Sequence, residues 1–159
     1  MHGGPDQAVL MYAGTHYPLW RAEWERDDLG PGAFGENLTV IGLDEDLTCI
    51  GDVLEIGEAR FQVSHPRQPC ATLARRHQVR NMIAVVQRNG RSGWYLRVLQ
   101  EGFLEAGQPI RLAQRPHPDW TVRRAALARL NRKDRPDEAA GLARCAALSI
   151  EWRERLARS

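Results

Sequence analysis

Residues 61–73 read Phe-Gln-Val-Ser-His-Pro-Arg-Gln-Pro-Cys-Ala-Thr-Leu, and the rest of the chain is best interpreted outward from this stretch. It opens with the alternation of apolar and polar residues that is typical of a β-strand. Pro66 and Pro69 each remove a backbone donor, which predicts that the strand ends before His65. The residues after Pro69 favour a short helix, so we expect Cys70 at or beside its first turn.

Cys70 is the candidate reactive residue of this stretch. A helix N-terminus and a nearby cation such as Arg67 favour the thiolate, which is the nucleophilic and metal-binding form of cysteine. His65 lies on the same rigid loop. An ordinary interpretation fits each residue equally: a lone cysteine is more often a small buried apolar residue, and His65 and Arg67 suit a strand end and a solvated surface. Spacing alone leaves both interpretations open.

Short strands separated by turn residues surround this stretch and favour a mainly β fold with helices. We expect further strands at residues 37–41, 47–50, 52–56, 91–99 and 108–112. Closely spaced strands of this kind indicate a barrel or a sandwich. We expect helices at residues 7–13, from Pro18 onward, and at 79–86.

A glycine-rich loop, Leu-Gly-Pro-Gly-Ala-Phe-Gly-Glu-Asn, occupies residues 29–37. Its glycines fit neither a phosphate-binding loop nor a dinucleotide fingerprint. The loop is either a turn with special backbone angles or a segment that brings backbone amides, Glu36 and Asn37 to a ligand. His2, next to two glycines, and Arg91 are candidate anion contacts, although such residues are more often solvated.

The C-terminal part of the chain differs in charge from the rest. Residues 113–159 contain 11 basic and 6 acidic residues, whereas residues 1–112 contain 11 and 14. This shift, together with a proline-containing linker, predicts a first domain over residues 1–114 and a second over residues 115–159. Thr121, Pro136 and Ser149 mark the starts of three short helices. A basic three-helix unit raises nucleic acid as a partner, but the interspersed acids favour an ordinary solvated surface.

The chain as a whole has the composition of a globular protein, with 43% hydrophobic and 26% charged residues. It shows no apolar run long enough to span a membrane and no leader with a basic and then an apolar region, so we expect a cytoplasmic protein. Three cysteines match no zinc pattern and suit a reducing compartment. Cys49 and Cys145 lie in apolar segments and are expected in the core.

Several motifs in order resemble the MOSC domain, which is found at the C-terminus of molybdenum cofactor sulfurases. They are His-Gly-Gly-Pro-Asp at 2–6, Gly-Ala-Phe-Gly-Glu-Asn-Leu-Thr at 32–39, Ile-Gly-Asp at 50–52, Val-Ser-His-Pro-Arg-Gln-Pro-Cys at 63–70 and Gly-Arg-Ser-Gly-Trp-Tyr at 90–95. The YiiM-like branch of that family is similar over nearly the whole chain, including residues 116–159.

The resemblance implies an α+β fold in which a MOSC-type β-barrel precedes a small three-helix domain. Members of the family have further strands upstream of the His-Gly-Gly motif, so we expect a barrel that is short at its N-terminal side. Such a barrel exposes an unpaired strand edge, which favours association, and a homodimer is among the expected states.

The resemblance also implies that the chain binds molybdenum cofactor, or molybdopterin. Cys70 falls on the family's cysteine and would be both the molybdenum ligand and the catalytic residue. The cofactor-binding residues by analogy are Phe34, Gly35, Glu36, Asn37, His65, Arg67, Arg91 and His2.

The activity that the resemblance implies is the reduction of N-hydroxylated small molecules of the hydroxylaminopurine type. An external electron-donor protein would supply the electrons, because the sequence shows no flavin, haem or iron–sulfur motif. One alternative is a carrier that holds sulfur as a Cys70 persulfide, or holds the cofactor, for delivery. A second alternative is a nucleic-acid-binding module that uses the basic C-terminal helices.

Overall fold

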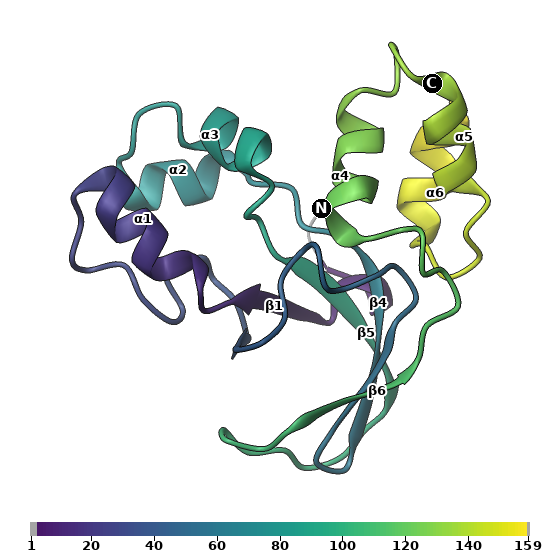
Figure 1. Ribbon diagram of the computed structural model, residues 1–159, viewed down its shortest axis with the longest axis horizontal. Coiled ribbons are helices and arrows are strands. Elements are labelled where there is room, and N and C mark those ends of the chain that lie inside the picture. Colours follow the sequence, from purple (N-terminus) through teal and green to yellow (C-terminus); the bar gives the residue numbers. More distant parts are fainter. Residues whose placement is uncertain (1–2, 159) are drawn as a thin grey trace.

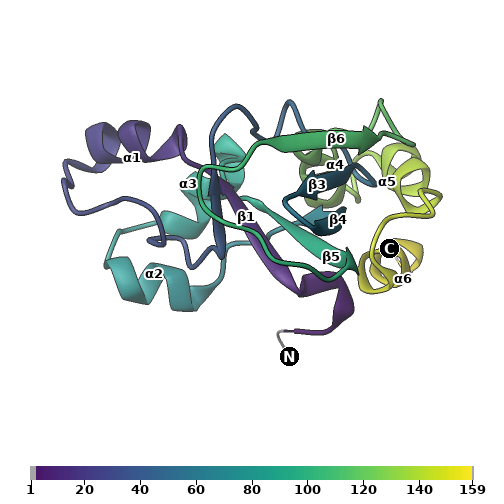
Figure 2. The same ribbon diagram turned by 90° about the horizontal axis from the view of Figure 1, so that it is seen from below.

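A curled six-stranded sheet lies at the centre of the computed structural model, which describes residues 3–158 (Figure 1). The strands are β1 (Val9–Ala13), β2 (Leu38–Val40), β3 (Val53–Ile56), β4 (Ala59–Pro66), β5 (Trp94–Gln100) and β6 (Ile110–Gln114). Their order is β2-β1-β5-β4-β3-β6, and every pair is antiparallel except β1 with β2. Figure 2 shows β6, β3, β4 and β5 following one another around the curl. Within the described residues the sheet is therefore an open half-barrel with β2 and β6 at its edges, and the expected α+β class is confirmed.

The part of the chain that the structure describes contains six helices, which lie in two groups beside the sheet (Figure 1). The first group contains α1 (His16–Trp24), α2 (Ala71–His77) and α3 (Met82–Asn89), and the second contains α4 (Val122–Leu130), α5 (Pro136–Ala143) and α6 (Ile150–Ala157). A 3-10 turn over Pro5–Gln7 precedes β1. None of the helices within residues 3–158 is both long and apolar enough to cross a membrane.

The expected starts of the C-terminal helices are confirmed by their caps. The Thr121 hydroxyl accepts a hydrogen bond from the Arg124 N–H, and the Ser149 hydroxyl accepts one from the Trp152 N–H. Pro136 lies in the first turn of α5, where its missing N–H has no helical acceptor to lose. These local signals place each helix without reference to the rest of the fold.

The central strand β4 continues further than expected. His65 and Pro66 remain in the sheet, opposite Tyr95 and Trp94 of β5, so the prediction that the strand ends before His65 was wrong. A register shift between Val63 and His65 accommodates the extra residue. Pro66 occupies the last strand position, and the next hydrogen bond is donated by the Arg67 N–H to the Gly93 carbonyl. The chain thus enters the 67–70 loop from a fixed point on the sheet.

Two other expectations were wrong. Residues 9–13 form β1 and not part of a helix, because they lie between β2 and β5 and Leu10 to Ala13 are buried. A strand that is covered on both faces reads as a continuous apolar run, which resembles a helix in sequence. Residues 47–50 form a turn in place of a strand, since the Asp44 and Asp52 carboxylates accept the backbone N–H groups of Leu47 and Cys49.

Two apolar cores hold the helices. One is shared by the sheet and the C-terminal helices and joins residues such as Ile50 and Phe61 to Leu142 and Trp152. The other lies under the first helix group and is largely aromatic, with members Tyr12, Tyr17, Trp20, Leu29, Ala33, Phe34, Leu73, Met82 and Val86. The 67–70 loop runs from the strand of the first core to the helix of the second.

Candidate functional site

Cys70 is the N-cap residue of α2 and is partly exposed, as the sequence predicted. Burial by itself raises the pKa of its thiol, but the N–H groups of Leu73 and Thr72, the Arg67 charge and the Thr72 hydroxyl outweigh burial and lower it. The thiolate is therefore more populated at this position than in an ordinary cysteine. Cys49 and Cys145 are buried, as expected of core cysteines, and burial raises the pKa of both thiols.

Arg67 connects the Cys70 loop to the glycine-rich loop. Its side chain is only 8% exposed, and its Nη1 donates a hydrogen bond to the Phe34 carbonyl at 2.9 Å. Its guanidinium carbon lies 6.0 Å from the centre of the Phe34 ring. Among residues 3–158 no carboxylate lies within ion-pair distance of Arg67, so its charge acts on the space next to Cys70.

Tyr95 is a residue near the candidate site that the sequence analysis did not identify. It lies opposite His65 in the β4–β5 ladder, and the two ring centres are 5.1 Å apart. Burial raises the pKa of its hydroxyl, the Arg67 charge opposes the rise, and Cys70 adds to it. Tyr95 is placed opposite His65 by the pairing register of β4 and β5, and this register cannot be predicted from the sequence of either strand alone.

His65 lies behind the site and is almost completely buried. Its Nδ1 lies 3.2 Å from the Ser64 hydroxyl and its Nε2 lies 3.2 Å from the amide nitrogen of Gln7. Its ring packs between Tyr95 and Trp152. Burial lowers the pKa of His65 to about 4, with Asp6 opposing the shift and nearby arginines adding to it, so the imidazole is neutral at pH 7.

Glu36 and Asn37 fasten the glycine-rich loop to the first helix group. The Glu36 carboxylate accepts hydrogen bonds from the hydroxyls of Tyr17 and Thr39 and from the N–H groups of Gly32 and Phe34. The Asn37 side chain and N–H both bond to the backbone of Leu10 in β1. Both side chains are thus engaged within the fold.

Phe34 and Gly35 form the part of this loop that lies nearest to Arg67. The Phe34 ring is fully buried and stacks on Tyr12 at 4.5 Å, while its carbonyl faces Arg67. Gly35 has φ +76°, a conformation that a side chain would strain, and no heavy atom lies within 4 Å of where its Cβ would be. The loop therefore presents open backbone on its outer side.

The Arg91 side chain is engaged by Glu23 of α1 and by Trp20. Its Nη1 donates to the Glu23 carboxylate at 2.8 Å, and its guanidinium carbon lies 4.8 Å from the Trp20 ring centre. His2 lies outside the described residues. The structure thus brings Arg67, Cys70 and the Phe34–Gly35 backbone together.

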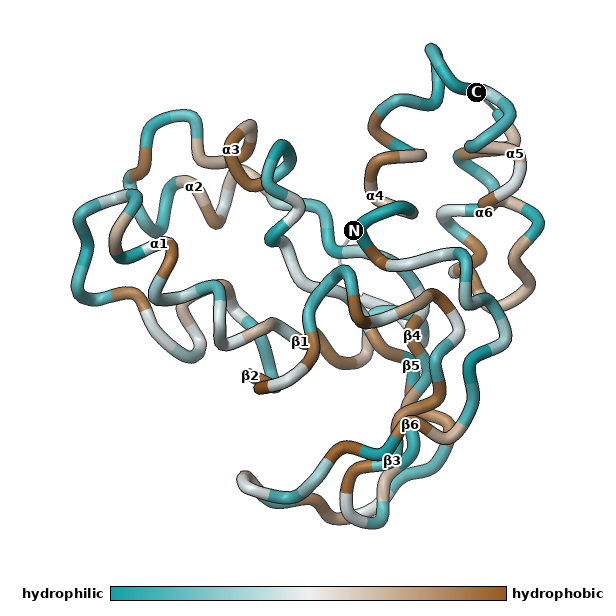
Figure 3. The backbone as a smooth tube through the Cα atoms, in the orientation of Figure 1, coloured by the Kyte–Doolittle hydropathy of each residue, from teal (hydrophilic) through white to brown (hydrophobic). Residues whose placement is uncertain are grey.

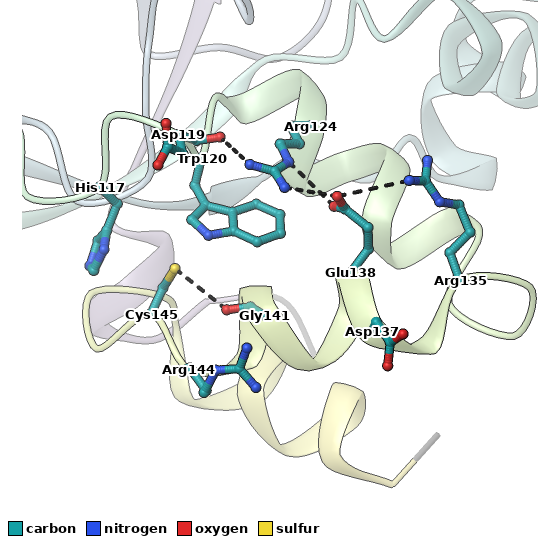
Figure 4. Close-up of a pocket in the computed structure, with 10 residues that line it drawn as sticks. All are labelled: His117, Asp119, Trp120, Arg124, Arg135, Asp137, Glu138, Gly141, Arg144 and Cys145. Carbon is teal, nitrogen blue, oxygen red and sulfur yellow. Dashed lines mark hydrogen bonds and ion pairs between the residues drawn. The ribbon is translucent and has the colours of Figure 1, made fainter.

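Hollows flank this group on two sides. One of about 480 Å³ lies between the glycine-rich loop and α2 and is lined by Arg26, Asp28, Arg76, His77 and residues 30–33. One of about 30 Å³ lies between Arg67 and α4. A larger hollow of about 690 Å³ lies among the C-terminal helices and contains none of the candidate residues (Figure 4). Cys70 remains the candidate reactive residue, because reactive groups and not volume define a site.

Known proteins resemble this chain in both sequence and structure. The model of the MOSC domain matches residues 1–111. The chain belongs to the MOSC domain family. It is 45% identical over 154 residues to the uncharacterized protein YflK of Bacillus subtilis, an alignment that covers 96% of this chain and 68% of YflK.

Two further relatives extend this picture. A protein named reductase from Gibberella moniliformis is 41% identical over 124 residues, which are 76% of this chain and 22% of the fungal protein. The crystal structure of YiiM from Geobacillus stearothermophilus superposes with a TM-score of 0.94 at 38% identity, covering 98% of this chain and 80% of YiiM. The chain is therefore a YiiM-like MOSC protein, and its half-barrel and helices follow the fold of that branch.

Cys70 should be the reactive thiol of the chain. We expect iodoacetamide to modify Cys70 before Cys49 and Cys145, with a pH midpoint below that of an ordinary cysteine. Because a cation favours the thiolate, Arg67→Gln should move this midpoint upward, and Arg67→Lys should move it less. Peptide mass spectrometry over a pH series measures each rate. A midpoint that Arg67→Gln leaves in place would contradict the electrostatic role of Arg67.

We expect the Glu36 carboxylate to stabilise the folded chain. Glu36→Gln leaves some of its four donors without an acceptor, so we expect the free energy of unfolding to fall by about 1–3 kcal/mol. Urea denaturation measures the change, with Glu101→Gln at an exposed position as the matched control. Equal stability of the two variants would show that the Glu36 carboxylate is free to serve a ligand.

Proposed function

We propose that this chain binds molybdenum cofactor at Cys70 and reduces N-hydroxylated small molecules, such as hydroxylaminopurines. The observation that carries the proposal is the Cys70 thiol, whose pKa is lowered at the start of α2, beside the buried Arg67 charge. Both features belong to a chain of the MOSC family, a domain that is associated with molybdenum cofactor sulfurases.

The residues around Cys70 fit such a group. A thiolate is a soft ligand that suits molybdenum, and a guanidinium suits a phosphate or a polar ring edge. The open backbone at Gly35 leaves room for a ligand beside Arg67. In this proposal Phe34 supplies the carbonyl that positions Arg67, Glu36 and Asn37 hold the loop, and His65 backs the site. Arg91 reaches the cofactor only if it leaves Glu23.

The reaction is a two-electron reduction in which the N–O bond breaks: R–NHOH, two electrons and two protons give R–NH2 and water. When bound, the cofactor supplies the electron transfer that breaks this bond. The chain positions the group through Cys70 and Arg67. The Tyr95 hydroxyl keeps its proton at neutral pH, since burial raises its pKa, and it can therefore donate a hydrogen bond to the substrate oxygen.

The fungal relative supports a reductive role. Its printed name is reductase, and the matched segment is about a fifth of its length, so in that protein a similar module occurs with much additional sequence. We infer that residues 1–114 hold the site and that a separate electron-donor protein serves it. Residues 115–159, the three-helix unit, are assigned no role in the reaction itself.

A sulfur carrier is the second candidate function, and one observation favours it. Cys70 is partly exposed while the other two cysteines are buried, so a persulfide on Cys70 is accessible to an acceptor protein and has no cysteine beside it for a disulfide. This reading predicts transferable sulfur and no reduction of hydroxylamines.

Metal and pterin analysis tests the proposal. We expect about one molybdenum per chain in protein made by cells that synthesise the cofactor, with a drop of at least about tenfold in Cys70→Ala and no change in Cys49→Ala. Loaded wild type should then reduce a hydroxylaminopurine with dithionite as the electron source. A folded wild type without molybdenum contradicts the proposal, and cyanide-releasable sulfur on Cys70 in that sample would support the carrier.

A further inference from the structure

A basic hollow lies at the free end of the C-terminal helices. It has a volume of about 370 Å³ and is lined by Arg129, Arg132, Lys133, Arg155, Leu156 and Arg158. The turn between α4 and α5 is the hydrophilic tip of this unit (Figure 3), and the end of α6 lies beside it (Figure 1). Every polar side chain in the lining is cationic.

Within residues 3–158 the cations of the basic hollow are only partly balanced by carboxylates. Arg155 pairs with Glu151 at 2.7 Å and Arg158 with Glu154 at 3.9 Å. Among residues 3–158, no carboxylate lies within 4 Å of the charged groups of Arg129, Arg132 and Lys133. Like charges held this close repel one another, and an external acidic surface would relieve that repulsion.

Arg129 shows the effect of this crowding. Its guanidinium carbon lies 4.6 Å from the ring centre of Trp152, so the side chain is fixed against α6. Burial lowers the pKa of Arg129, and the Arg155 and Arg132 charges lower it further. Packing against Trp152 thus holds the Arg129 guanidinium in surroundings that disfavour its positive charge.

α4 and Trp152 connect the basic hollow to the surroundings of Cys70. The small hollow beside Cys70 is lined by Arg67 and Pro69 on one side and by Leu130 and Trp152 on the other. In Figure 1, α3 and α4 face each other across the upper part of the molecule. Leu130 on α4 is 50% exposed, and Arg129 packs on the same Trp152 ring. The end of α4 therefore combines an exposed leucine with a cationic rim, next to the Cys70 loop.

We propose that this end of α4, with Leu130 at its centre and Arg129, Arg132 and Lys133 at its rim, docks an acidic redox protein that carries an iron–sulfur or flavin centre. The inference rests on the proposed function, whose reduction consumes two electrons per N–O bond. Two one-electron donors, or one two-electron donor, become oxidised in each turnover, and water supplies the two protons. Small interfaces with complementary charge suit such short-lived electron-transfer complexes.

The surroundings favour an acidic protein over nucleic acid. Glu151 and Glu154 interrupt the cations, and the exposed Leu130 adjoins them, whereas a nucleic-acid surface is a continuous basic stripe. The hollow shown in Figure 4 provides the contrast within the same unit. There Asp119, Asp137 and Glu138 match Arg124, Arg135 and Arg144 in number, and Arg124 and Arg135 both pair with Glu138.

Binding to a probe tests the docking surface without turnover. A plant-type [2Fe–2S] ferredoxin is a suitable acidic probe, measured by calorimetry with the full chain. We expect wild type to bind it, binding to weaken strongly at about 0.5 M NaCl, and Arg132→Glu/Lys133→Glu to lose about tenfold or more in affinity. The matched control, Arg135→Glu/Arg144→Glu, makes the same charge change at two residues that line the hollow of Figure 4 and not the basic hollow, and it should keep most of its affinity.

Three results of the binding experiment overturn the inference: no ferredoxin binding by folded wild type, an equal loss in both double variants, or tighter binding of a DNA duplex at the same residues. The last result would assign the surface to nucleic acid. Dithionite-driven reduction separates this inference from the proposed function. A small reductant needs no docking, so Arg132→Glu/Lys133→Glu should keep that activity while losing ferredoxin-driven activity. Absence of dithionite-driven activity in loaded wild type rejects the function itself, and unchanged ferredoxin-driven activity rejects only the docking surface.

Discussion

The hydrogen bond from Arg67 to the Phe34 carbonyl is the contact on which the site depends. It joins the end of β4 to the glycine-rich loop and holds a largely buried positive charge beside Cys70. A buried cation is costly unless its donors are satisfied, and here the Phe34 carbonyl satisfies one of them without neutralising the charge. The same charge that the fold must accommodate is the one that favours the Cys70 thiolate.

The rest of the first helix group keeps that carbonyl in place. Phe34 is stacked in an aromatic core, and the Glu36 carboxylate gathers four donors from the loop and its neighbours. On the other side, His65 and Trp152 connect the sheet to α6. Arg67 and Cys70 thus lie between the packed first helix group and the sheet with α6. A scaffold of this kind positions reactive groups on a loop.

Local signals in the sequence predicted much of this arrangement. Thirteen residues contain the signals for the strand, the two prolines that follow it and the helix start at Cys70. Thr121 and Ser149 are N-cap residues and mark the starts of two C-terminal helices. Motifs in order also indicated the MOSC family. What failed was set by tertiary context: β1 is apolar because it is covered on both faces, and the turn at residues 47–50 depends on carboxylates that compete with a ladder.

The site could be predicted only in part for the same reason. Cys70 and Arg67 are three residues apart, so their proximity follows from the loop. Tyr95 comes from a different strand, and its place depends on a register shift in β4. The engagement of Glu36 with Tyr17 likewise needs the packed fold. The cofactor roles of Phe34, Gly35, Glu36, Asn37, His65, Arg67, Arg91 and His2 remain predictions.

The central claim is that the Cys70 sulfur ligates molybdenum. X-ray absorption at the molybdenum edge, on protein loaded with cofactor, counts the sulfur atoms around the metal. Comparison of wild type with Cys70→Ser should show one sulfur neighbour fewer in the variant, with an oxygen in its place. An unchanged number of sulfur neighbours in a loaded Cys70→Ser protein would contradict the claim and would leave Cys70 without a role as ligand.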